Sequence, residues 1–106
     1  MEIIVTHVSA DFDAFASMVA AGRIYPRAKM VLPTAINSNV RRFITLYEDE
    51  LPPLAEASDL DFSPVKKVIM VDTRIPSRTG PAGAVIRDPS TEVVVFDHHM
   101  KTKKDV

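Results

Sequence analysis

The sequence predicts an α/β fold in which an open, mainly parallel sheet carries helices on both of its faces. Several short apolar runs lack the polar alternation of half-exposed strands, so they are expected to be strands buried on both faces. Between these runs, apolar residues recur at helical spacing. Strands that alternate with helices form parallel sheets through right-handed crossovers, which predicts a doubly wound layer. With 106 residues, the chain is expected to form one domain, 1–106, with a modest core.

Strands are predicted where a continuous apolar run is bounded by turn or polar residues. Four runs fit this description, at residues 2–6, 28–32, 67–71 and 93–96. A further short strand is placed at Leu60 and Phe62, inside the connector that follows Pro52 and Pro53. A turn is expected at residues 88–90, just before the last strand.

Two helices are predicted from apolar spacing and from capping residues. The first ends before Pro26, because proline cannot continue a helix. Its apolar stripe, interpreted as core, consists of Phe15, Met18 and Val19. The second helix is expected to be capped by Asn37 or Ser38. The segment 76–87 is expected to be a loop followed by at most a short helix.

The composition excludes several classes of protein and of site. The chain has no cysteine, so disulfides and thiolate metal sites are excluded and only His and carboxylate ligands remain. A net charge of −1 does not indicate a surface that binds polyanions over the whole chain. No apolar run approaches the roughly 20 residues of a membrane span, and the start shows no signal peptide, so a cytoplasmic protein without a membrane partner is expected.

Ionisable residues gather where three of the predicted strands end. They are His7, Asp11 and Asp13 after the first strand, Asp72 after residues 67–71, and Asp97, His98 and His99 after the last. The carboxyl ends of parallel strands lie on one edge of a sheet, so these side chains are expected to converge. Neighbouring carboxylates repel one another, and a set of imidazole and carboxylate ligands suits Mn, Fe, Co or Zn. This pattern predicts a dinuclear metal site in which one aspartate bridges two cations.

Some of these residues also have an interpretation that needs no metal. An aspartate before a helix usually caps it, and capping alone would account for Asp13. His7 by itself would more often be a packed histidine with satisfied hydrogen bonds. The repetition of the same chemistry at three strand ends favours the metal site over these alternatives.

The same residues resemble a known family, the DHH phosphoesterases. The matching motifs are His7-x3-Asp11-x-Asp13-Ala14-x2-Ser17, Val71-Asp72-Thr73 and Asp97-His98-His99. The family includes family II inorganic pyrophosphatases, exopolyphosphatases, nanoRNA and cyclic-dinucleotide phosphodiesterases, and single-strand-specific DNA exonucleases. The stretch from Val71 to Arg78 is similar to a subgroup in which the DHH domain precedes CBS domains and a tRNA nucleotidyltransferase/poly(A) polymerase domain.

The resemblance implies a role for each residue of the motifs. One metal would be held by His7, Asp11 and Asp72, and the second by Asp13, Asp72 and His98, so that Asp72 bridges the two cations. The expected metal is Mn²⁺, with Mg²⁺ or Co²⁺ as alternatives, and a water held between the metals would attack phosphorus. His99 would contact the substrate phosphate as a donor or acid, and Asp97 would orient the imidazoles. Arg74 and Arg78 would add phosphate contacts, although both also fit the interpretation of a surface arginine.

Two departures from the family pattern concern the end of the chain. The family's second metal usually takes another aspartate well after the DHH triplet, and a second domain closes over the substrate. The sequence ends at Val106 before either feature. It is therefore interpreted as an incomplete N-terminal piece of a longer protein.

The predicted function is metal-dependent hydrolysis of a phosphodiester or phosphoanhydride in an oligonucleotide, cyclic dinucleotide or polyphosphate. The alternative is an accessory metal- or RNA-binding module of a tRNA nucleotidyltransferase-related protein. A Rossmann-type dinucleotide site is excluded, because the chain has only three glycines and no glycine-rich turn after the first strand. The expected partners are a phosphate-containing substrate, with RNA or a nucleotide as candidates, and further domains of the parent chain; the activity of this piece and its oligomeric state are left open.

Overall fold

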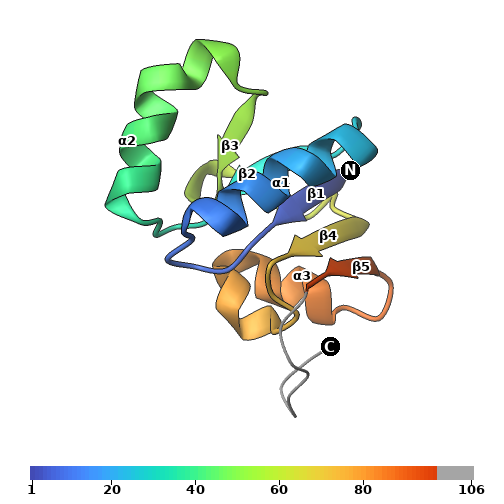
Figure 1. Cartoon of the computed structure of the whole chain (residues 1–106). Coiled ribbons are helices and arrows are strands. Elements are labelled where there is room, and N and C mark those ends of the chain that lie inside the picture. The colour runs from blue at the N-terminus through green and yellow to red at the C-terminus, as the bar shows by residue number, and fades with distance from the viewer. Residues whose placement is uncertain (98–106) are drawn as a thin grey trace.

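The computed structural model describes residues 1–97, and its centre is a parallel sheet (Figure 1). Within these residues the sheet has five strands in the order β3-β2-β1-β4-β5, and every neighbouring pair is parallel. The strands are β1 (Glu2–Val5), β2 (Lys29–Leu32), β3 (Leu54–Glu56), β4 (Lys67–Val71) and β5 (Glu92–Phe96). The predicted α/β fold with a parallel sheet is confirmed.

Helices cover both faces of the sheet. Helices α1 (Phe12–Ile24) and α2 (Ser38–Tyr47) lie on one face, and the 3₁₀ segment η3 (Pro76–Ala82) with α3 (Gly83–Arg87) lies on the other (Figure 1). The remaining 3₁₀ turns are η1 (Glu48–Glu50) and η2 (Ala57–Asp59). No helix within residues 1–97 is long and apolar enough to cross a bilayer.

The two faces follow from the alternation of side chains along each strand. In β1, Ile3 and Val5 belong to the core cluster that includes Ile86 of α3, whereas Ile4 belongs to the cluster with Met18 of α1. Ile3 and Ile4 are both fully buried, which explains why the run shows no polar position. Burial of each such side chain contributes about 1.5–3 kcal/mol to folding.

A third cluster joins the two helices on one face. It consists of Phe15, Leu32, Val40 and Ile44, and Val19 packs against it partly buried. Since Met18 is fully buried in the cluster of Ile4, the predicted stripe of α1 lies in the core. Asn37 caps α2 and accepts a hydrogen bond from the Asn39 amide at 2.8 Å, which decides between the two capping residues that the sequence allowed.

The strand expected at Leu60 and Phe62 is wrong. The third strand is instead β3 (Leu54–Glu56), which ends well before β4 begins at Lys67. It pairs with β2, with Leu54 opposite Met30. Turn η2 follows β3 at once, so the chain leaves the sheet before Leu60. Leu60 and Phe62 instead pack, partly buried, against the cluster on the α3 face. The apolar character of Leu60 and Phe62 therefore reflects packing against the core from a connecting segment, and not a strand.

The strand order places a switch point between β1 and β4. From β1 the chain moves outward to β2 and β3 on one side, and later to β4 and β5 on the other. In open parallel sheets, ligands bind outside the carboxyl ends of the strands at such a switch point. A ligand site is therefore expected at the loop after β1 and the residues after β4.

Candidate metal centre

His7 directly follows Thr6 at the carboxyl end of β1 and faces Asp72. Its Nε2 lies 3.2 Å from Oδ2 of Asp72, and its Nδ1 lies 2.9 Å from the carbonyl oxygen of Val8. A carbonyl oxygen can only accept, so Nδ1 must be the donor in that hydrogen bond. In the neutral ring, Nε2 then presents a lone pair toward a carboxylate oxygen. This arrangement matches a metal-binding histidine whose other nitrogen is held by a backbone carbonyl.

Asp11 supplies the third ligand atom of the group and also caps α1. Its Oδ1 accepts a hydrogen bond from the Ala14 amide at 3.0 Å. Potential ligand atoms of His7, Asp11 and Asp72 all lie within 4.8 Å of one another. One imidazole nitrogen and two carboxylate oxygens are ligands that divalent transition metals accept, so this group is suited to bind such a metal.

Within residues 1–97, the group with this ligand spacing does not include Asp13. It lies exposed in the first turn of α1, where its charge is favourable beside the helix N-terminus. The interpretation of Asp13 as the N-cap is wrong, because the helix already begins at Phe12 and Asp11 is its cap. The role of Asp13 in a second metal position stays a prediction.

Asp72 has an uncommon backbone conformation at the end of β4. Its φ is 57°, in the left-handed region that non-glycine residues rarely adopt. The side chain is nearly buried, with 7 % of the residue exposed, and the amide donates to the carbonyl oxygen of Phe96 at 2.9 Å. Strained backbone of this kind costs on the order of 1–3 kcal/mol and is concentrated at functional sites. Here it turns the Asp72 carboxylate toward His7.

The loop that carries His7 and Asp11 is held by backbone contacts from the 3₁₀ segment η3 and from the loop after β2. Three hydrogen bonds connect it, from the Val8 amide to the Arg78 carbonyl at 2.6 Å, from the Ser9 amide to the Ala35 carbonyl at 2.7 Å and from the Asn37 amide to the Ala10 carbonyl at 2.9 Å. Ser9 is the other non-glycine residue with positive φ within residues 1–97, at 62°. Loops after β1, β2 and β4 therefore form one connected structure around the candidate site.

Comparison with known proteins agrees with this geometry. The family model "DHH family, N-terminal domain" matches residues 2–106. The chain belongs to the DHH family. That family is associated with phosphoesterase activity, and its domains generally bind divalent metals.

A curated relative of this DHH domain is the A-adding tRNA nucleotidyltransferase of Geobacter sulfurreducens. It is 36% identical over 106 residues, which is all of this chain but 12% of the relative. No solved structure matched the chain. The family predicted from the motifs is confirmed, and the name of the relative agrees with the predicted link to tRNA nucleotidyltransferases.

The last DHH motif is described only at its first residue. The carboxylate of Asp97 is 1% exposed and lies 3.1 Å from Nε of Arg74, whose Nη2 donates to the Asp97 carbonyl at 3.0 Å. His98 and His99 lie outside the described residues, so their predicted roles stay predictions. The same holds for the predicted role of Asp97 as a partner of the imidazoles.

Arg74 and Arg78, the two arginines predicted to contact phosphate, make different contacts in the structure. Arg74 contacts Asp97, as above, while the exposed Arg78 contacts the DHH domain's first loop through its backbone carbonyl. Sequence reasoning missed this backbone role, and no signal could have revealed it, because every residue type has the same carbonyl group.

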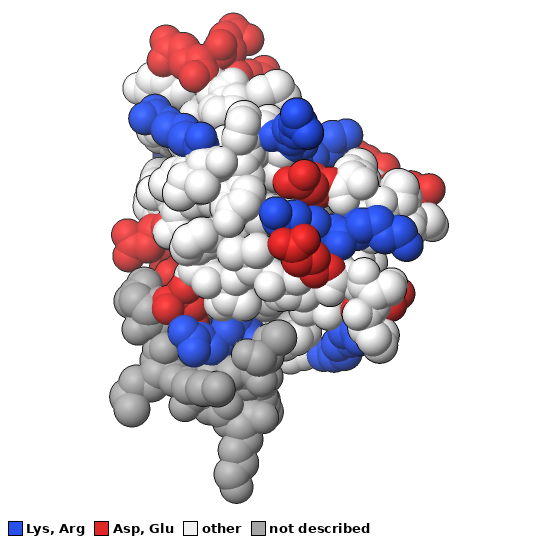
Figure 2. Space-filling view, turned by 90° about the vertical axis from the view of Figure 1, so that its right-hand side faces the viewer, with Lys and Arg blue, Asp and Glu red and all other residues white. Residues whose placement is uncertain are grey.

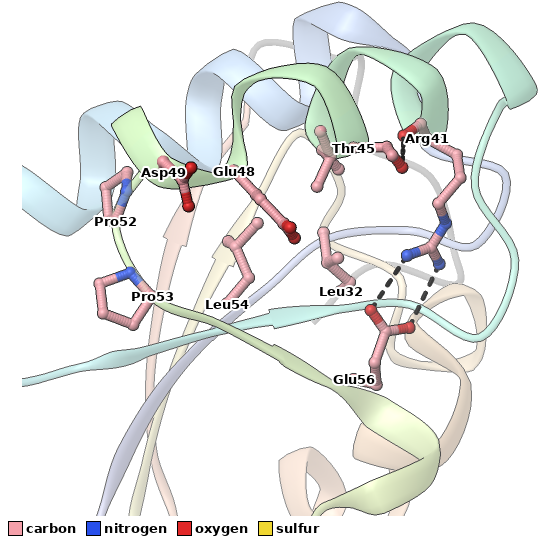
Figure 3. A pocket seen from close by; sticks show the side chains of 10 residues that line it. Leu32, Arg41, Thr45, Glu48, Asp49, Pro52, Pro53, Leu54 and Glu56 are labelled. Atoms are coloured by element: carbon pink, nitrogen blue, oxygen red, sulfur yellow. Dashed lines mark hydrogen bonds and ion pairs between the residues drawn. The ribbon is translucent and has the colours of Figure 1, made fainter.

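A cavity of about 340 Å³ lies apart from the metal group, between α2 and the edge strand β3 (Figure 3). Arg41 and Glu56 form a bidentate pair across it, with nitrogen–oxygen distances of 3.0 and 3.2 Å. Glu48 and Asp49 also line the cavity. Within residues 1–97 these acids do not form a group with the ligand spacing seen at His7, Asp11 and Asp72.

Proposed function

We propose that this DHH domain is a divalent-metal-dependent phosphoesterase that acts on a phosphodiester or phosphoanhydride. The observation that carries the proposal is the meeting of His7, Asp11 and Asp72 at the switch point of the sheet. Two carboxylates and an imidazole at one point would repel or remain poorly paired without a cation. The association of the family with phosphoesterase activity supports the same reading.

The proposed metal is Mn²⁺, with Mg²⁺ or Co²⁺ as alternatives. His7, Asp11 and Asp72 would hold one cation, and by the family resemblance Asp13, Asp72 and His98 would hold the other. An imidazole in the set favours Mn²⁺ over Mg²⁺, which prefers oxygen ligands and retains its waters. When bound, such cations make a water more acidic and neutralise charge on the phosphate oxygens.

Hydrogen bonds within the chain orient the proposed metal ligands independently of substrate. The Val8 carbonyl sets the ring orientation of His7, and the Ala14 amide holds one oxygen of Asp11. The hydrogen bond from the Asp72 amide to Phe96 fixes the strained turn after β4. His99 would donate a hydrogen bond or a proton to the phosphate. Positioning of this kind supplies a large part of the rate in phosphoryl transfer.

The second candidate is an accessory module of a larger protein related to tRNA nucleotidyltransferases. The observation that favours it is the relative, since the chain covers only 12% of that protein. In this reading the domain is one part of a longer cytoplasmic chain and contacts RNA or nucleotide. On the described part of the face in Figure 2, however, Lys and Arg are interspersed with Asp and Glu. That pattern differs from the continuous basic stripe typical of nucleic-acid binding.

Turnover assays in Mn²⁺ separate the two candidates. The substrates are a chromogenic phosphodiester and pyrophosphate, tested with this chain and with a longer chain that includes the residues after 106. Hydrolysis should depend on the metal and should be lost in Asp72→Asn, while the exposed Asp49→Asn serves as the matched control. The shorter chain is expected to be slower by several decades, because groups that hold the substrate in line can supply about 7–11 kcal/mol.

Failure of both chains to turn over either substrate, with Mn²⁺ bound, would contradict the phosphoesterase proposal and favour the accessory module. Equal rates for the two chains would show that the first three motifs suffice for catalysis.

A further inference from the structure

Aromatic side chains gather between the start of α1 and the outer side of α2. The ring of Phe12 meets the ring of Phe43 edge to face, with centroids 5.7 Å apart and planes at 83°. Phe43 in turn lies 4.8 Å from the ring of Tyr47. Phe12 and Tyr47 are 48% and 45% exposed, so the two end rings both face solvent. We call Phe12, Phe43 and Tyr47 the aromatic row.

The aromatic row is anchored in the core through its middle member. Phe43 packs partly buried against the cluster that joins α1 and α2, and its ring lies 6.3 Å from that of the buried Phe15. An edge-to-face contact uses at most one face of each ring. Since Phe12 is also half exposed, it keeps ring surface that a flat ligand can cover. A surface already held in place loses little conformational freedom when a ligand binds.

Phe12 also lies next to the candidate metal centre. It directly follows Asp11, which belongs to the group of metal ligands, so the two Cα atoms are about 3.8 Å apart. In a nucleotide, a single sugar separates the base from the phosphate. A phosphate bound at the metal group therefore leaves its base within reach of a neighbouring ring, whereas inorganic polyphosphate has no flat group to place there.

Two features favour a base as the partner of the aromatic row. All three members are aromatic, and every base has a flat π-face that stacks on such rings whatever its identity. Beyond Tyr47, the chain continues into the acidic turn η1 (Glu48–Glu50). Its negative charges repel a long polyanion that follows α2. The row therefore suits the single base nearest the reacting phosphate better than an extended strand.

We propose that Phe12 is a specificity-determining residue that stacks a base of the substrate, with Phe43 and Tyr47 supporting its ring surface. This inference rests on the proposed function and narrows its substrate class. The substrate is then a nucleotide ester or anhydride, in which a base lies beside the reacting phosphate, and not inorganic polyphosphate.

The first measurement compares two ligands that carry the same phosphate. AMP has a base, ribose 5-phosphate has none, and each is titrated into this chain in Mn²⁺ by calorimetry. The wild type should bind AMP more tightly than ribose 5-phosphate. Phe12→Leu should bind AMP about 5–100-fold more weakly, the range expected for one lost stacking ring, and should bind ribose 5-phosphate as the wild type does.

Two further variants test whether the ring itself is responsible. Phe12→Tyr keeps an aromatic ring and should retain the affinity for AMP. The matched control is Leu46→Ala, which removes an exposed apolar side chain of α2 without removing a ring, and it should leave AMP binding unchanged. Thermal unfolding of each variant checks that it is folded.

The second measurement is turnover of the dinucleotide pApA in Mn²⁺ by the longer chain that continues beyond residue 106. Phe12→Leu should raise KM and leave kcat largely unchanged, because stacking on a base stabilises the bound substrate and the transition state equally. An unchanged KM together with a reduced kcat would contradict a stacking role.

The outcomes separate this inference from the proposed function. Equal affinities of the wild type for AMP and ribose 5-phosphate, or no binding of AMP, would overturn the inference without reference to any variant. Unchanged AMP affinity in folded Phe12→Leu would also overturn it. Hydrolysis of pyrophosphate without a preference for AMP would support the phosphoesterase function and remove the stacking role. A preference for AMP that depends on Phe12, without turnover of any phosphoester, would support stacking and contradict the phosphoesterase function.

Discussion

Two regions of this domain contain the same local chemistry in different surroundings. At the carboxyl edge of the sheet, Asp11 caps α1 and Arg74 pairs with Asp97. At the cavity in Figure 3, Arg41 of α2 pairs with Glu56. The same helix is capped by Asn37, whose amide donates to the Ala10 carbonyl of the loop after β1. Each region therefore has a capped helix and an arginine–carboxylate pair. Within residues 1–97, a histidine and two carboxylates meet at one point in the first region and not in the second.

The two pairs differ in exposure. The side chains of Arg41 and Glu56 are 44% and 40% exposed, whereas the Asp97 carboxylate is 1% exposed. The hydrogen bond to Glu56 raises the pKa of Arg41 above its usual value, but water screens much of that attraction. A buried carboxylate is not solvated by water, so it depends more strongly on its charged partner. The comparison indicates that an arginine–carboxylate contact contributes more to stability at a buried end of the sheet than on the surface.

The largest expected effect is the loss of the buried pair. Arg74→Gln should lower the free energy of unfolding by about 3 kcal/mol, because it leaves the Asp97 carboxylate buried without its guanidinium. Urea denaturation with a two-state fit measures this. Arg74→Lys should be less harmful, since it retains the positive charge. A loss below about 1 kcal/mol for Arg74→Gln would place both pairs in the same energetic class and end the comparison.

The next effect concerns the convergence of ligands. Mn²⁺ at about 100 times its Kd should stabilise the wild type by about 2.7 kcal/mol, because it binds only the folded site. Asp72→Asn should lose most of this stabilisation, since Asp72 contributes to both proposed metal positions. Thermal unfolding with and without Mn²⁺ checks the prediction, and Asp49→Asn in the other acidic region is the control. Equal stabilisation of the wild type and Asp72→Asn would contradict it.

The two caps should differ by a smaller amount. Asn37→Ala should cost about 1 kcal/mol, the usual value of a lost N-cap. Asp11→Ala should cost less in the metal-free protein, because it also removes repulsion from the nearby Asp72 carboxylate. With Mn²⁺ present the order should reverse, since Asp11→Ala then loses a ligand. Urea denaturation in a chelator and in Mn²⁺ measures both cases, and the same order in both would remove Asp11 from the metal group.

The smallest effect is expected at the exposed pair. Arg41→Gln should cost at most about 1 kcal/mol, and the cost should shrink as salt screens the attraction. Denaturation at low and high ionic strength measures it. A cost that is large and independent of salt would mean that the cavity between α2 and β3 is less open to water than its exposed lining indicates.

Much of the fold was predictable because the strands are buried on both faces. A run such as Val68–Val71 has no polar position, and burial explains that pattern almost alone. The prediction failed at Leu60 and Phe62, where apolar residues pack from a loop. It also missed β3, whose three half-buried residues carry too short a pattern to distinguish an edge strand from a connector.

By itself the sequence determined the family, the class of fold and the chemical types available for a site. Because the chain has no cysteine, the histidines and aspartates at strand ends were the candidate metal ligands. Their order along the chain matched the DHH motifs. This information is local, because it depends on residue type, spacing and the burial that a strand imposes.

The tertiary structure decided which of those residues meet. It brought His7, Asp11 and Asp72, the set that the family resemblance implied for one metal, to one point without Asp13, gave Asp72 a left-handed backbone, and paired Arg74 with Asp97. None of these facts follows from spacing, because each depends on the register of parallel strands that lie far apart in the sequence. His7 and Asp72 are 65 residues apart, yet the pairing of β1 with β4 brings their side chains within 3.2 Å of each other.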